Sequence, residues 1–205
     1  QDALLPSVES GLIVLIGAAW WIAQANTLAD LRGWSPFIGL QIEYSLIERT
    51  VERELIPAAK ALNLGVTAWS PLANGVLTGK YHGLGSSEKG RMSADIMKEF
   101  LPEQQRTDRI VAAVKTVSDE IGRSMAQVAL AWLRHRAVPV IPIIGARKLS
   151  QLQDNLASFG LTLSPSQLKT LDEASRIELG FPHDLFAKEM VRAMGYGGLR
   201  DQILA

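Results

Sequence analysis

The chain has 205 residues, 47% of them hydrophobic and 20% charged, which fits a single folded domain with a sizeable core. Its 21 basic and 21 acidic residues cancel, so no overall field draws the protein toward nucleic acid or an anionic membrane, and we expect neither as a partner. The lack of cysteine rules out disulfides, thiolate chemistry and cysteine-ligated zinc, and is compatible with the cytoplasmic location that we expect, while the three scattered histidines do not indicate a metal site.

The first predicted unit is a strand followed by a helix. The run "GLIVLIG", Gly11–Gly17, is short, β-branched and bounded by glycines, which is typical of a strand covered on both faces. Apolar residues at helical spacing then predict a helix over Ala18–Gly33. The apolar stretch Gly11–Ala25 does not read as a signal or membrane segment, because it follows acidic residues, lacks a basic flank and ends in polar residues.

The same alternation continues along the chain. It predicts strands at Phe37–Tyr44 and Gly65–Leu72 with a helix at Thr50–Asn63 between them. Residues 73–102 are rich in Gly, Ser and charge without a sustained period, and we interpret them as one long loop, which in most proteins is functional or mobile.

The second half of the chain adds three helices and a fourth strand. These are predicted at Arg106–Ile121, Ser124–Arg136, Val138–Ile144 (the strand) and Leu149–Ser158. Ser124 is the expected N-cap of its helix, and Ser164 with Pro165 begins one more. Residues 180–205 show no period and are expected to wrap over the surface as a tail of one single domain, 1–205.

Four strand-helix alternations predict a parallel sheet in an α/β protein. Two architectures remain open, a doubly wound open sheet and a (β/α) barrel. In both, ligands bind at the carboxyl ends of the strands. We therefore expect Gln41–Tyr44, Trp69–Leu72 and Gly145–Lys148 to share one face of the sheet, where the candidate site lies.

The last of these stretches indicates an anion site. In "VIPIIGARKLSQLQDNL", Val140–Leu156, Gly145 is expected to let the backbone turn, and a helix begins within a few residues. The free N–H groups and the dipole of a helix start favour an anion, and Arg147 can add a forked contact that suits a phosphate. The alternative is a solvated turn whose cations face water, and periodicity does not decide between the two.

Two long stretches resemble the second half of the aldo-keto reductases. They are "LQIEYSLIERTVERELIPAAKALNLGVTAWSPLANGVLTGKY", Leu40–Tyr81, and the anion stretch above, and the resemblance extends from Gly11 to about Arg176. It is strongest to the bacterial branch that is similar to potassium-channel β subunits. It implies a TIM-type (β/α)8 barrel that binds NADPH in extended form and reduces aldehydes and ketones by hydride transfer.

The resemblance also carries over nine cofactor-binding residues, namely Gln41, Trp69, Ser70, Pro71, Leu72, Gly145, Arg147, Gln151 and Asn155. The first two match the residues that bond the nicotinamide carboxamide and stack on its ring, and the next three match the turn beside the pyrophosphate. Gly145 and Arg147 match the region of the adenosine 2′-phosphate, while Gln151 and Asn155 match positions near the adenine and its ribose.

Several of these residues also have plain structural interpretations. Trp69 could fill the core, and Gln41 could satisfy neighbouring backbone groups. Tyr44 matches a tyrosine with a structural role in the family, not the proton donor. Asp154 fits a capping or ribose-proximal group better than a catalyst.

The catalytic part of the family pattern is missing. Reducing a carbonyl needs a proton at its oxygen, which in the family comes from a tyrosine tuned by a lysine, an aspartate and a histidine. These four lie in the first half of the barrel, and residues Gln1–Ser10 contain no Tyr, Lys or His. The family's turn of a Ser and an Asn or Asp is also missing, because Gly17 runs directly into Ala18. We therefore assign no catalytic residue and expect an incomplete barrel of about four β/α units plus C-terminal helices.

Three functions stay open at this point. The chain is an NADPH-dependent reductase of aldehydes and ketones whose catalytic half is missing, a catalytically inactive NADP(H)-binding or regulatory module, or a folded remnant. Half a barrel leaves two strand edges and one apolar face uncovered, so two copies are expected to associate. Alternatively, the residues given are the ordered part of a longer chain. The substrate is not predictable.

Overall fold

The computed structural model describes residues 14–15, 19–80, 103–197 and 199. In this part of the chain four parallel strands form one sheet in the order β1-β2-β3-β4, and the strands are β1 (Val14–Leu15), β2 (Gly39–Glu43), β3 (Gly65–Trp69) and β4 (Val140–Pro142). Gly39 lies opposite Gly65 across the central pair, and Val66 lies opposite Val140. The predicted parallel α/β architecture is thus present.

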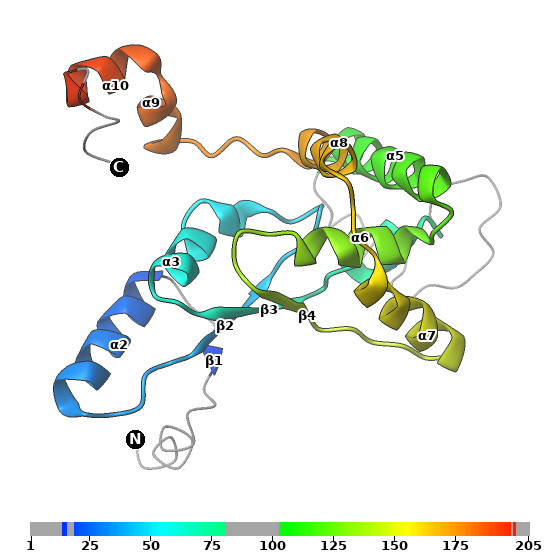
Figure 1. The fold of residues 1–205 in the computed structure, drawn as a ribbon, viewed down its shortest axis with the longest axis horizontal. Helices are drawn as coiled ribbons and strands as arrows, with labels where there is room; N and C mark the ends of the chain where they lie inside the picture. Colours follow the sequence, from blue (N-terminus) through cyan, green and yellow to red (C-terminus); the bar gives the residue numbers. More distant parts are fainter. Residues whose placement is uncertain (1–13, 16–18, 81–102, 198, 200–205) are drawn as a thin grey trace.

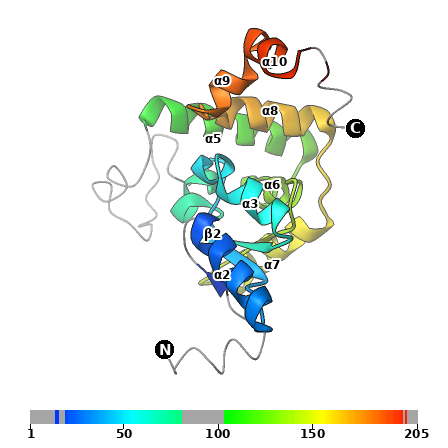
Figure 2. The ribbon, with the colours of Figure 1, turned by 90° about the vertical axis from the view of Figure 1, so that its left-hand side faces the viewer.

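Helices connect and flank the strands (Figure 1). The connections within the sheet are α2 (Ala19–Arg32), η1 (Thr50–Glu52), α3 (Leu55–Ala61), η2 (Ala73–Thr78), α5 (Gln104–Ile121) and α6 (Met125–Arg134). After β4 come α7 (Leu149–Ala157), η3 (Ser158–Gly160), α8 (Pro165–Ser175), α9 (His183–Ala187) and α10 (Glu189–Tyr196). Both ribbon views show α5 and α8 side by side (Figures 1 and 2).

The predicted helix starts are confirmed where a local cap defines them. The Ser124 hydroxyl accepts a hydrogen bond from the backbone N–H of Gln127 at 3.1 Å. Ser164 and Gln167 form a reciprocal capping box, with Pro165 in the first turn of α8. Such caps satisfy N–H groups that have no partner within the helix, so they fix where the helix begins.

One face of the sheet carries the core. Leu40, Ile42, Val66 and Ala68 are at most 4% exposed and belong to one cluster that includes side chains of α3, α5 and α6. The largest fully buried side chain is that of Trp132 in α6. Burial of this continuous apolar surface is the main stabilising contribution to the fold.

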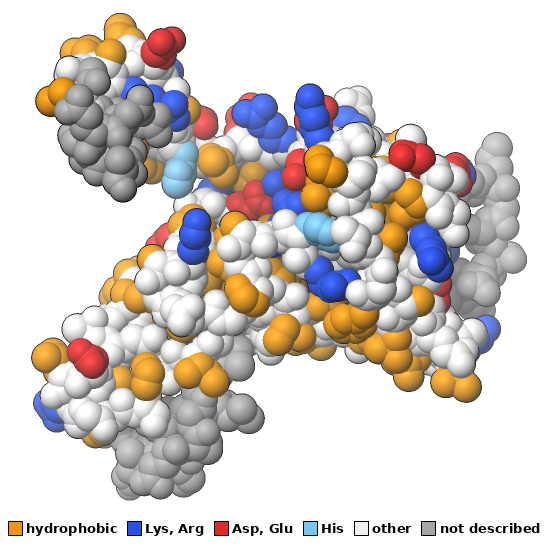
Figure 3. Space-filling view, in the orientation of Figure 1, with side chains coloured by type: hydrophobic (Ala, Val, Ile, Leu, Met, Phe, Trp, Pro, Cys, Tyr) orange, Lys and Arg blue, Asp and Glu red, His pale blue; other side chains and the backbone are white. Residues whose placement is uncertain are grey.

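The opposite face is open in the described part of the chain. Trp69, Ile141 and Ile143 are 39%, 61% and 44% exposed, and Figure 3 shows hydrophobic side chains along the underside of the sheet. Within the described residues, β3 and β4 are therefore covered on one face only. The open face agrees with the incomplete sheet that was expected. β4 is also shorter than predicted, because prolines at positions 139 and 142 cannot donate to a strand ladder.

The two predicted irregular segments contain helical turns. Residues 73–102 begin with η2, in which Asn74 and Gly75 are left-handed, and 81–102 lie outside the described residues. The prediction of a tail without periodic structure that wraps over the surface is corrected, because α9 and α10 form and Figure 1 shows them at the end of an extended segment away from the sheet. Each helix has eight residues or fewer, too short to show a repeating apolar pattern.

A cluster of charged and aromatic side chains holds α8 against α6 and η1. The Asp172 Oδ1 atom accepts hydrogen bonds from Trp132 Nε1 at 2.9 Å, Arg136 at 2.9 Å and Arg49 at 3.2 Å. The guanidinium carbons of Arg136 and Arg49 lie 4.0 and 5.1 Å from the centroid of the Trp132 ring. Arg49 also forms a two-pronged ion pair with Glu52. We call these five residues the Trp132 cluster.

Candidate functional site

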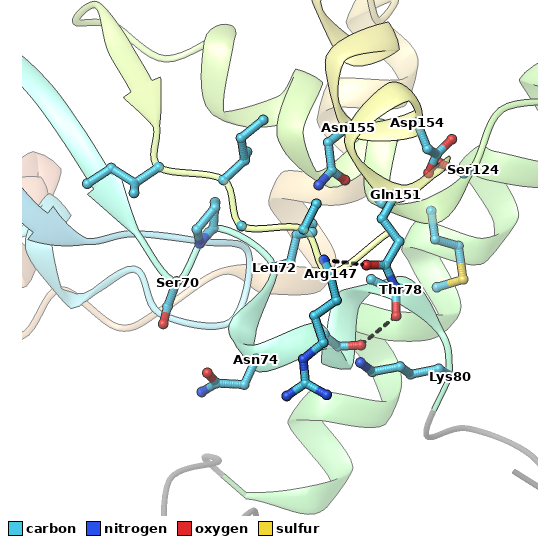
Figure 4. A pocket seen from close by; sticks show the side chains of 18 of the residues that line it. Ser70, Leu72, Asn74, Thr78, Lys80, Ser124, Arg147, Gln151, Asp154 and Asn155 are labelled. Carbon is cyan, nitrogen blue, oxygen red and sulfur yellow. Dashed lines mark hydrogen bonds between the residues drawn. The ribbon is translucent and has the colours of Figure 1, made fainter. Parts of the chain in front are cut away.

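A cleft of about 850 Å³ lies at the carboxyl ends of β3 and β4, between η2 and the first turns of α6 and α7 (Figure 4). Eight of the nine residues predicted to bind the cofactor line it, namely Trp69, Ser70, Pro71, Leu72, Gly145, Arg147, Gln151 and Asn155. The topology brings them together because parallel strands end at the same edge of a sheet.

The ninth residue, Gln41, lies outside the lining of this cleft. It is in the middle of β2, where its Oε1 atom is 3.5 Å from the Thr67 hydroxyl, a long hydrogen bond across the open face of the sheet. Gln41 thus lies outside the cleft but on the same face of the sheet as Trp69, which is two residues beyond its partner Thr67.

The wall from η2 is a tight turn with unusual backbone angles. Ser70, Ala73 and Asn74 have φ values of 50°, 46° and 54°, and Gly75 has 93°. The Thr78 hydroxyl donates to the Gly75 carbonyl oxygen at 2.7 Å, which fixes the end of the turn. Left-handed angles are costly for residues other than glycine, and they are found most often at ligand sites.

The opposite wall is the turn from β4 into α7. The Gln151 Oε1 atom accepts hydrogen bonds from the backbone N–H groups of Arg147 at 2.9 Å and Lys148 at 3.2 Å. Figure 4 shows the Arg147 side chain extending toward the side of the cleft where Asn74 and Lys80 lie. The helix start therefore presents a guanidinium group on a backbone that is tied to the helix.

The expectation that Gly145 allows this turn is corrected. Its φ does not fall in the left-handed range, and a Cβ atom added there would meet nothing within 4 Å. The conformation of the backbone does not by itself require glycine at this position.

The end of the cleft near α6 holds two polar side chains of α7. Asp154 accepts hydrogen bonds from the Ser124 hydroxyl at 2.7 Å and from Gln127 Nε2 at 2.6 Å. Asn155 is 5% exposed and lines the cleft. A carboxamide that lines a cleft offers both a donor and an acceptor to a polar ligand group such as the edge of a purine.

Sequence reasoning singled out Arg147, Lys148 and Asp154 but missed Lys80 and the place of Ser124 in the cleft. Three of the four charged residues in its described lining are basic, Lys80, Arg147 and Lys148, and the fourth is Asp154. Ser124 was recognised only as a helix cap, because nothing local shows that it lies against a residue 30 positions away. An excess of positive charge suits an anionic ligand.

Tyr44, another side chain that could take part in proton transfer, lies away from the cleft. Tyr44 is 1% exposed, and its hydroxyl donates to Glu52 at 2.6 Å. Burial, and then the negative charge of Glu52, raise the pKa of Tyr44 far above its ordinary value, so the phenol is a structural donor. Within the described residues, no group of three or more acidic, histidine or cysteine side chains could hold a metal ion, and no helix has the length and apolarity to span a membrane.

Comparison with known proteins identifies the family to which the chain belongs. The model of the aldo/keto reductase family matches residues 2–176. The chain belongs to the aldo/keto reductase family. Similar curated proteins include an oxidoreductase of Bacillus subtilis named YrpG, with 34% identity over 84% of this chain and 52% of that protein. An aryl-alcohol dehydrogenase [NADP(+)] of Phanerodontia chrysosporium is 30% identical over 87% of this chain and 48% of its own length.

A third relative within the family is the aldo-keto reductase ausK of Aspergillus calidoustus, with 29% identity over 90% of this chain and 48% of that protein. The chain therefore spans about half the length of the curated relatives that it matches. All three relatives are named as oxidoreductases or as members of oxidoreductase families, which agrees with the family assignment.

Proposed function

We propose that the chain is the cofactor-binding part of an NADPH-dependent aldo/keto reductase of aldehydes or ketones, and that it forms about half of the family's (β/α)8 barrel. The supporting observation is the cleft at the strand ends, which gathers eight residues of the family's cofactor pattern and three basic side chains. When bound there, NADPH would supply the hydride of the reduction.

Different residues of the cleft would contact different parts of the cofactor. Arg147 offers the two-pronged donor geometry that fits the 2′-phosphate, which distinguishes NADPH from NADH. Asn155, which lines the cleft, would contact the adenine or its ribose. At the other end Trp69, which is 39% exposed, offers a ring face for the nicotinamide.

A second candidate is a module that binds NADP(H) without turnover. The described residues that line the cleft include no tyrosine and no histidine. Tyr44 is buried away from the cleft, and its hydroxyl donates a hydrogen bond to Glu52. A carbonyl reduction needs a proton donor at the reacting oxygen. Binding of NADPH without carbonyl-dependent oxidation would favour this module, and no binding would favour a folded remnant.

The test is a titration of the purified chain with NADPH and with NADH, followed by tryptophan fluorescence. We expect saturable binding that prefers NADPH, and Arg147→Ala should weaken NADPH by about 10- to 100-fold, the loss of a hydrogen bond to a charged group, while changing NADH little. Equal losses for the two cofactors would contradict the 2′-phosphate assignment. Carbonyl-dependent NADPH oxidation then separates the two candidates.

We also propose that a second copy of the chain covers the open face of the sheet. Trp69, Ile141 and Ile143 expose apolar surface there, and β1 and β4 are the outer strands of the sheet in the described part of the chain. A twofold axis parallel to the strands would place β4 of one copy beside β1 of the other, closing eight parallel strands, a number whose interior side chains can fill. A monomeric mass by light scattering at micromolar concentration would contradict this.

A further inference from the structure

We infer that Gln151 acts on the cofactor mainly through the turn that it holds, as a positioning residue for Arg147, and not by accepting a hydrogen bond from the adenosine. This inference rests on the proposed function. It differs from the family-based expectation, in which Gln151 lies against the adenine or its ribose.

The hydrogen bonds of Gln151 carry the argument. Its Oε1 atom accepts from two backbone N–H groups, Arg147 at 2.9 Å and Lys148 at 3.2 Å (Figure 4). A carboxamide oxygen has two lone pairs, so both are used within the protein. The Oε1 atom therefore has no lone pair left for the amino group of a purine, and only the Nε2 group of this side chain stays available, as a donor.

The same two bonds change how the helix start can bind an anion. The N–H groups of Arg147 and Lys148 point at Gln151, so they are not available to a phosphate. The contact with a 2′-phosphate then depends on the guanidinium of Arg147, supported by the dipole of α7. How well that guanidinium is placed depends on the backbone from which it extends.

Gln151 supplies that placement. It sits in the first turn of α7, where its own N–H bonds to the Lys148 carbonyl oxygen at 3.1 Å. Arg147 and Lys148, the two residues before α7, are thereby both hydrogen-bonded to Gln151 in the first turn of the helix. Without the side-chain acceptor these two N–H groups form hydrogen bonds with water, and the turn is less ordered. The protein then binds the 2′-phosphate more weakly, because binding must order the backbone of Arg147 as well as its side chain.

Helix α7 also contains a residue that serves as a matched control for changes at Gln151. Gln153 is exposed, lies two positions further along the helix and has no hydrogen bond in the described structure that an identical change would remove. Methionine replaces glutamine with nearly the same shape and helix propensity but without the acceptor. Gln153→Met therefore controls for the effect of the same exchange on α7, outside the cleft lining and without the bonds to the turn.

The experiment is a double-mutant cycle with NADPH and NADH. We expect Gln151→Met to weaken NADPH by up to the 10- to 100-fold loss of Arg147→Ala, and NADH by less than about twofold. In the Arg147→Ala background Gln151→Met should cause no further loss, because non-additivity marks residues that act through one another. Gln153→Met should bind as the wild type.

A second measurement needs no cofactor. Amide hydrogen exchange at Arg147 and Lys148 should quicken about fivefold in Gln151→Met, the opening expected when a hydrogen bond is lost. It should stay slow in Gln151→Glu, which keeps an acceptor at this position of the helix. Unchanged exchange in Gln151→Met would overturn the inference.

The binding outcomes separate this inference from the proposed function. Additive losses for Gln151→Met and Arg147→Ala, or equal losses for NADPH and NADH in Gln151→Met, would mean that Gln151 touches the adenosine and would overturn the positioning role. If the wild type shows no preference for NADPH, or Arg147→Ala does not reduce it, the proposed function itself fails.

Discussion

Replacing Asp172 by alanine tests how α8 is held to the rest of the fold. One carboxylate oxygen of Asp172 accepts from Trp132, Arg136 and Arg49, which come from α6, the segment after it and the segment before η1. Alanine removes all three hydrogen bonds at once. It leaves the two guanidinium groups beside the Trp132 ring without this carboxylate.

The magnitude follows from the burial of the partners. The side chains of Arg49 and Arg136 are 10% and 11% exposed, whereas that of Asp172 is 38% exposed. Breaking a fully buried pair costs about 3–5 kcal/mol, and an exposed pair is worth about 0–1 kcal/mol. Water can reach the site of Asp172, and Arg49 keeps its ion pair with Glu52 at 2.8 Å. We therefore expect a loss of about 2–3 kcal/mol in the free energy of unfolding.

Urea unfolding followed by far-UV circular dichroism measures this loss. The control is Asp119→Ala, which removes the Lys115–Asp119 pair on α5, where both side chains are 64% exposed. That change should cost less than about 0.5 kcal/mol. A loss for Asp172→Ala no larger than that of the control would refute the view that this carboxylate organises the Trp132 cluster.

Three further changes test single features of the fold. Ser124→Ala removes the cap of α6 and a hydrogen bond to Asp154, and should lower the free energy of unfolding by about 1–2 kcal/mol in urea titrations; no loss would contradict the capping role. Burial, and then Glu48, raise the pKa of Glu43, so the folded state holds its proton more tightly and stability falls as pH rises through that pKa. Glu43→Gln should therefore exceed the wild type in stability at about pH 7 but not at about pH 4, and a pH-independent difference would refute this. Gly145→Ala should leave the thermal midpoint unchanged, since the turn has neither a left-handed φ nor a neighbour within 4 Å; a clear drop would show that the turn needs glycine.

Much of the fold follows from signals that lie close together in the sequence. Apolar runs and helical spacing identified the described strands β2 to β4 and the described α-helices from α2 to α8, but not η2. The caps at Ser124 and Ser164 depend on residues only three positions away. The carboxyl ends of parallel strands meet at one edge, so the position of the cleft also followed from the order of the elements. Eight of the nine predicted site residues lie there for this reason.

The sequence by itself thus determined the parallel sheet, its helices and the edge that carries the site, because periodicity and capping act over a few residues. The tertiary structure alone decided the rest. The bond from Arg49 to Asp172 joins residues 123 positions apart, and the one from Ser124 to Asp154 joins residues 30 apart. Contacts at such separations depend on how the elements pack, and no local pattern encodes them. The same holds for Gln151, since only the folded turn shows that its oxygen is already used within the protein.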